Sequence, residues 1–125
     1  MNANQRAQFN KFFDVLHEHM GNDPFMAAKT AWVLDDENAV IPASRLEHMR
    51  FFIDARLGGR EFRVGKTDVA GANVSTVFIG EQRIIFETMV SGGPLDGRFY
   101  RWKTWEAAEA GHKSVCKWCE QGSDE

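Results

Sequence analysis

The sequence has little that would cross-link it covalently or hold it in a membrane. It contains two cysteines and three prolines in 125 residues, and no apolar run approaches the roughly 20 residues that cross a bilayer. The opening segment Met1–Asn10 is polar, so we expect no signal peptide. Two cysteines without an export signal indicate free thiols in a reducing compartment. We therefore expect a cytoplasmic protein with no membrane partner.

The sequence also lacks a recognisable catalytic motif. Gly59–Thr67 is close to a phosphate-binding loop, but five residues separate Gly59 from Gly65 where that loop has four. His17 and His19 have one residue between them, whereas the helical zinc-protease motif has three. No nucleophile elbow is present. We therefore expect a non-enzymatic protein that uses no cofactor.

What the chain does have is enough apolar material for a core. The hydrophobic fraction is 43%, with ten phenylalanines and four tryptophans, and the length is typical of one domain. The net charge of −3 is unevenly distributed, because residues 43–103 carry ten Lys and Arg against seven Asp and Glu. The middle of the chain is thus mildly basic and its two ends are acidic, and the basic middle could bind an anionic partner.

Apolar spacing predicts helices in the first half of the chain. Residues 4–20 form an amphipathic pattern, and Phe25–Leu34 is a short alanine-rich segment that we interpret as a second helix. Asp35–Pro42 is interpreted as an acidic loop. A third helix opens at Ser44, which forms a capping-box pattern with Glu47.

Beyond residue 60 the pattern alternates, which predicts strands. A half-buried strand around Phe62 and Val64 leads to a turn over Thr67–Asn73. Two apolar runs, Val74–Ile79 and Arg83–Val90, then predict a hairpin of central strands buried on both faces.

An edge strand over Arg98–Lys103 leads into a final helix capped by Thr104, in which Gly111 indicates close contact with the sheet. The predicted fold is α+β, with N-terminal helices, a four-stranded antiparallel sheet and a C-terminal helix packed on the sheet. We interpret residues 1–125 as a single domain, comprising a helical part (1–59), the sheet with the last helix (60–120) and a frayed tail (121–125).

Three segments of this second half read VSTVFIG (Val74–Gly80), FETMVSGGPLDG (Phe86–Gly97) and TWEAAEAGH (Thr104–His112). Together they resemble a C-terminal module of small proteins encoded by tailed bacteriophages and prophages. The chain departs from that pattern in a short loop after Gly80, in Ser91 where an aromatic residue is usual, and in its cysteine pair. The resemblance implies a phage accessory protein acting in a bacterial host, and it implies no activity, cofactor or site residue.

Two clusters of side chains are candidate ligand sites. The strand Arg98–Lys103 alternates cations with rings, and rings can stack on unpaired bases while cations neutralise phosphates; the residues of this candidate nucleic-acid site are Arg98, Tyr100, Arg101, Trp102 and Lys103. His112, Cys116 and Cys119 share one helical stripe and are suitable zinc ligands. Structural zinc sites usually take their cysteines from a loop, so we favour packing of these three residues and expect no metal.

The last candidate is a protein-binding surface at Trp32, Asp35, Asp36 and Glu37, where an aromatic anchor precedes an acidic run. We therefore expect an accessory protein that binds and modulates a host macromolecule, such as an anti-defence or host-takeover inhibitor. A host protein is the expected partner. A nucleic-acid-binding module and a virion or assembly component are the alternatives, and a homo-oligomer is left open.

Overall fold

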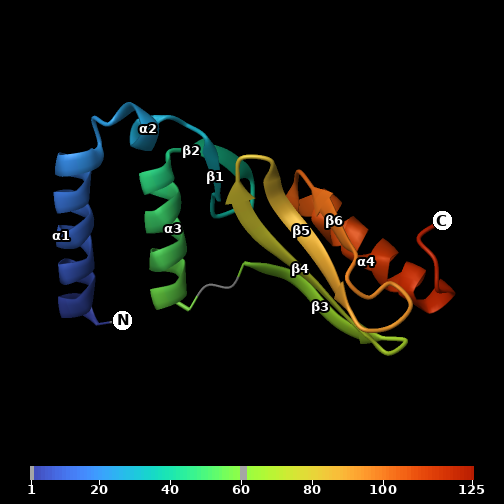
Figure 1. The fold of residues 1–125 in the computed structure, drawn as a ribbon. Helices are drawn as coiled ribbons and strands as arrows, with labels where there is room; N and C mark the ends of the chain where they lie inside the picture. The colour runs from blue at the N-terminus through green and yellow to red at the C-terminus, as the bar shows by residue number, and fades with distance from the viewer. Residues whose placement is uncertain (1, 60–61) are drawn as a thin grey trace. The chain divides into compact units, whose positions relative to one another are not determined.

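A computed structural model describes residues 2–59 and 62–125 (Figure 1). The chain divides into two compact units, and each is described by itself. The first unit comprises Met1–Leu34 and Ile41–Glu61, and the second comprises Asp35–Val40 and Phe62–Glu125. The predicted α+β class is confirmed: helices come first, followed by an antiparallel sheet and a C-terminal helix that packs on its strands.

The first unit is built on two helices that lie side by side, α1 (Ala3–Met20) and α3 (Arg45–Leu57) (Figure 1). Their contact is a small apolar cluster in which Phe9 and Phe13 of α1 meet Leu46 of α3. The predicted capping box is confirmed, because Ser44 Oγ accepts from the Glu47 amide at 3.1 Å and Glu47 Oε1 accepts from the Ser44 amide at 3.0 Å.

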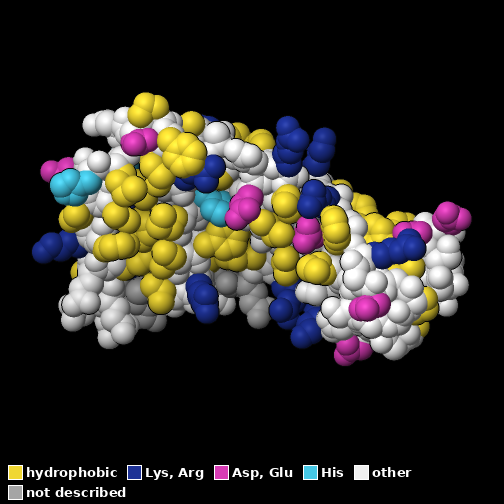
Figure 2. Space-filling view, in the orientation of Figure 1, with side chains coloured by type: hydrophobic (Ala, Val, Ile, Leu, Met, Phe, Trp, Pro, Cys, Tyr) yellow, Lys and Arg dark blue, Asp and Glu magenta, His cyan; other side chains and the backbone are white. Residues whose placement is uncertain are grey.

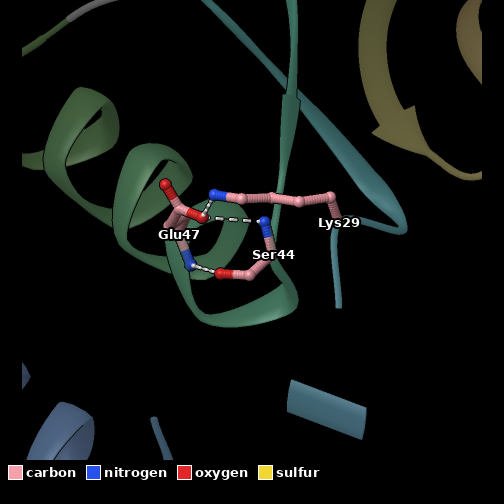
Figure 3. A network of polar contacts seen from close by, with 3 residues as sticks. All are labelled: Lys29, Ser44 and Glu47. Atoms are coloured by element: carbon pink, nitrogen blue, oxygen red, sulfur yellow. Dashed lines mark hydrogen bonds and ion pairs between the residues drawn. The ribbon is translucent and has the colours of Figure 1, made fainter. Parts of the chain in front are cut away.

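The same Glu47 carboxylate also pairs with Lys29, so it lies between a side-chain cation and a helix N-terminus (Figure 3). The hydrogen bond from Lys29 is the main cause that lowers the pKa of Glu47, and the bonds to Ser44 act in the same direction. This local network fixes where α3 begins.

The predicted helix over Phe25–Leu34 is wrong. The structure has a single helical turn there, α2 (Pro24–Ala27), followed by a strand, β1 (Ala31–Leu34), which pairs with β2 (Val40–Ala43). The predicted loop over Asp35–Pro42 thus contains the start of a strand. The alanines favour helix, but Trp, Val and Leu in succession also fit a strand, and packing decides between them.

The second unit contains an antiparallel sheet of four strands in the order β3 (Arg63–Val69), β4 (Ala72–Glu81), β5 (Ile84–Ser91) and β6 (Phe99–Trp102). The hairpin of β4 and β5 and the edge position of β6 are confirmed, whereas the predicted number of four strands is too low, because β1 and β2 bring the strands of the described residues to six. The turn predicted over Thr67–Asn73 is wrong in extent, because only Ala70 and Gly71 lie outside the strands. Both have positive φ, as a tight two-residue hairpin turn requires. The part of the predicted first strand at Glu61 lies outside the described residues.

Helix α4 (Trp105–Gln121) packs across all four strands on one face of this sheet (Figure 1). Thr104 caps it as predicted, with Oγ1 accepting from the Ala107 amide at 3.0 Å. The core of this unit includes a buried cluster of Ala72, Val74, Val90, Leu95, Val115 and Cys119, and the buried side chains of Phe78 and Phe86. Gly111 lets the helix approach, because a Cβ there would come within 2.4 Å of the Trp102 ring.

The loop between β5 and β6 is anchored at its middle. Leu95 is buried in the core, and Asp96 Oδ1 accepts from the Gly92 amide at 2.6 Å.

The frayed tail predicted for residues 121–125 is partly held in the structure. Asp124 accepts from Arg98 at 2.6 Å and from the Tyr100 hydroxyl at 2.9 Å.

Candidate functional site

The candidate site is the face of the β3–β6 sheet opposite α4, which we call the open face. Strand register assigns side chains to it, because residues paired across an antiparallel sheet point to the same side. Its residues form two rows across the four strands: Arg63, Val77, Glu87 and Arg101, and then Lys66, Ser75, Met89 and Phe99.

Large apolar side chains are exposed on the open face. Phe99 and Met89 are direct cross-strand partners, and their exposed fractions are 54% and 50%. We expected the two central strands to be buried on both faces, and that expectation is wrong for the open face. Val77 is half-buried, whereas its neighbours Thr76 and Phe78, which point toward α4, are fully buried.

Charge on the open face is predominantly positive. Arg63 and Lys66 of β3 are exposed, as are Arg101 of β6 and Lys103 just beyond it. The Arg101 guanidinium lies 5.1 Å from the Phe99 ring centre and donates to Glu87 at 3.3 Å, so it is held beside the exposed ring. Figure 2 shows Lys and Arg side chains interspersed with apolar ones over this part of the molecule.

The predicted nucleic-acid site on β6 is divided between the two sides of the sheet. Arg101 lies on the open face, but Tyr100 and Trp102 point toward α4. The Trp102 indole donates to Thr88 at 2.9 Å, and Tyr100 packs on Trp118 with ring centres 5.3 Å apart. Arg98 is paired with Asp124.

Sequence reasoning missed the residues that other strands contribute to the open face. Met89, Arg63 and Lys66 were not among the candidates, although the alternation of β3 and β5 could have assigned them to one side. What the sequence could not tell was which side α4 covers, because that depends on how the helix folds back.

Behind the open face, a chain of hydrogen bonds ends on a buried histidine. Trp102 Nε1 donates to Thr88 Oγ1 at 2.9 Å, and the Thr88 and Thr76 hydroxyls share a hydrogen bond of 2.6 Å. The Thr76 hydroxyl is also hydrogen-bonded to His112 Nδ1 at 2.7 Å. On the other side of the ring, His112 Nε2 is hydrogen-bonded to the Thr67 hydroxyl at 2.9 Å. Both ring nitrogens are therefore occupied by threonine hydroxyls.

Burial of His112 lowers its pKa below the usual 6.5. The residue is thus a neutral core histidine that ties α4 to the sheet.

The stripe of His112, Cys116 and Cys119 does not form a metal site in the structure. Among the described residues, no group of three His, Cys, Asp or Glu side chains is placed to hold an ion. Cys119 is buried in the core, and burial, with a smaller contribution from Cys116, raises the pKa of its thiol. Cys119 thus packs in the core as a small apolar group, and Cys116 is half-buried beside it.

The predicted protein-binding residues lie in or beside the β1–β2 hairpin. Asp35 accepts from the amides of Glu37 and Ala39 at 2.8 and 2.9 Å, so its carboxylate shapes the turn. Asp36 and Glu37 are exposed in that turn, and Trp32 on β1 is half-buried. Two of the four predicted residues therefore present exposed carboxylates.

No protein-family profile, curated protein or solved structure matches this chain. Within the described residues, every helix is too short or too polar to span a bilayer.

Proposed function

We propose that this protein is a non-enzymatic phage or prophage accessory protein that binds a host macromolecule through the open face. The observation that carries the proposal is the paired exposure of Phe99 and Met89 on a sheet face opposite the helix. Exposed apolar groups bordered by charges are typical of interaction surfaces. The resemblance to phage proteins supplies the setting, the cytoplasm of an infected bacterium.

The proposed mechanism is steric: the preformed sheet covers a site on its partner and so inhibits it, as an anti-defence or host-takeover protein would. Two features support binding over catalysis. Both nitrogens of His112 are occupied by hydroxyl groups, and Cys119 is a buried thiol whose pKa is raised. Neither residue is poised as a base or a nucleophile.

The test is affinity capture from host lysate with three forms of the tagged protein. The first is unchanged, and the second carries Met89→Ser with Phe99→Ser on the open face. The third carries Phe12→Ser with Val15→Ser on α1 and is the matched control, because Phe12 and Val15 are 54% and 44% exposed. We expect one stoichiometric host macromolecule with the first and third forms and its loss with the second. Equal retention by all three would contradict the proposed surface.

A second candidate surface is the turn of the β1–β2 hairpin, because Asp36 and Glu37 are exposed there. Carboxylates in this turn could imitate a nucleic-acid backbone against a basic host protein. A fourth capture form, Asp36→Asn with Glu37→Gln, tests it. Loss of the partner with this form and retention with the open-face form would transfer the proposal to the hairpin.

A further inference from the structure

We infer that the ligand of the open face is single-stranded nucleic acid, an inference that rests on the proposed function and names its partner class. The open face combines the two elements that such a ligand needs. Exposed rings stack on unpaired bases, and cations beside them neutralise the backbone. On this sheet the two elements come from different strands, so neither β6 nor β3 forms the site alone.

The stacking element is Phe99 with Met89 beside it. Both side chains are about half exposed although they lie on paired strands, so one surface of this pair faces solvent. Arg101 is held next to the ring by Glu87, so a cation lies beside the stacking position. Base stacking is tolerant of sequence, so we expect little preference among bases.

The backbone element consists of cations on the two outer strands of this four-stranded sheet. Arg63 and Lys66 lie on β3, and Arg101 and Lys103 lie on or just beyond β6. Four strands at the usual spacing make the face about 14 Å wide. Phosphates of a strand that crosses the sheet would therefore meet a cation at each border.

Charge complementarity favours this ligand over an acidic or apolar protein segment. The strand register places three cations on the face, Arg63, Lys66 and Arg101, against two carboxylates, Glu87 and Asp68, and both carboxylates already have partners. Glu87 accepts from Arg101, and Asp68 accepts from Asn73 at 2.8 Å. A duplex is disfavoured because its bases are not available to Phe99.

The test is fluorescence anisotropy of the full chain with labelled ten-nucleotide oligo-dT and oligo-U, and with a DNA duplex of the same length, from 50 to 300 mM salt. We expect both single strands to bind more tightly than the duplex. Affinity should fall as salt rises, because phosphate contacts release counterions.

Two pairs of variants locate the site. Phe99→Ala should weaken binding about tenfold, whereas Phe12→Ala, which removes a ring of the same 54% exposure from α1, should leave binding unchanged. Lys66→Gln with Arg101→Gln should reduce both the affinity and the salt slope. The matched charge control is a double Lys→Gln variant on α4, at the exposed positions Lys113 and Lys117.

Several outcomes overturn the inference. They are absence of oligonucleotide binding at 50 mM salt, tighter binding of the duplex, or equal effects of the test and control variants. One combined result would overturn this inference and still support the proposed function. In it, the protein binds no oligonucleotide, and it captures a host protein that stays bound after nuclease treatment and is lost when Met89 and Phe99 are replaced. Circular dichroism of each variant confirms that a loss of binding is not a loss of fold.

Discussion

At the scale of single residues, neighbours determine what His112 does. In the sequence it stands beside two cysteines and resembles a zinc ligand. In the structure both its nitrogens meet threonine hydroxyls, from Thr76 and Thr67, and only 8% of the residue is exposed. These threonines come from β3 and β4, so nothing within the helix could have identified them.

The neutral state of His112 predicts a pH dependence of stability. Its pKa is lowered in the folded chain, so between that value and the usual 6.5 the unfolded chain binds more protons than the folded one. The free energy of unfolding should therefore rise as the pH rises toward 6.5 and level off above it. Urea unfolding from about pH 5.5 to 7.5 measures this change.

The control for this prediction is His112→Gln, which leaves the other three histidines in place. Their contributions are common to both proteins, so the difference between the two pH profiles isolates His112. A variant whose unfolding free energy changes with pH as steeply as that of the unchanged protein would contradict the prediction.

Residue types also indicated part of the candidate site. The period of two over Arg98–Lys103 puts Phe99 and Arg101 on the same side of a strand, and both do lie on the open face. The identity of the exposed ring could not be predicted. Phe99 and Trp102 are both aromatic, and only the position of α4 decides that Trp102 is the covered one.

At the scale of elements, local signals gave reliable predictions. Ser44 and Thr104 cap the helices that they were expected to cap, because an N-cap bond closes over three residues and needs no distant partner. The strand β1 was missed for the opposite reason. Its four residues, Ala31–Leu34, depend on pairing with another strand, and short apolar segments fit helix and strand equally.

The docking of α4 depends on the missing side chain at Gly111. We expect Gly111→Ala to destabilise the protein by about 1–3 kcal/mol, because the added methyl group would overlap the Trp102 ring. Helix propensity alone predicts the opposite sign, a gain of about 1 kcal/mol. Thermal or urea unfolding distinguishes the two.

A double-mutant cycle with Trp102→Leu isolates the cause. If the ring is what the methyl group meets, then Gly111→Ala should be much less destabilising in the Trp102→Leu background. Additive effects of the two substitutions would show that the Trp102 ring is not the cause of the destabilisation by Gly111→Ala.

At the scale of the whole molecule, the two units have cores of different size. Among the described residues, the larger buried apolar side chains of the first unit are Phe9, Phe13, Leu34 and Leu46, whereas those of the second are Val74, Phe78, Phe86, Val90, Leu95 and Val115. Phe12 and Val15 of α1 are also exposed. Less buried apolar area means a smaller free energy of local opening in the first unit.

Hydrogen exchange followed by mass spectrometry measures this difference. We expect the amides of α1 to exchange at least about tenfold faster than those of β4 and β5, whose strands have neighbours on both sides. The amides of β6, an edge strand, serve as an internal reference with intermediate protection. Exchange from α1 as slow as from β4 would contradict the prediction.

The glycine pair that follows β5 has a consequence for how relatives of this chain can vary. A Cβ at Gly92 would come within 2.7 Å of the Gly71 carbonyl oxygen, and one at Gly93 within 3.1 Å of Ala72. Two segments twenty residues apart in sequence therefore constrain each other. Both glycines also have positive φ, so homologues that keep the two-residue turn at Ala70 and Gly71 should keep both of them.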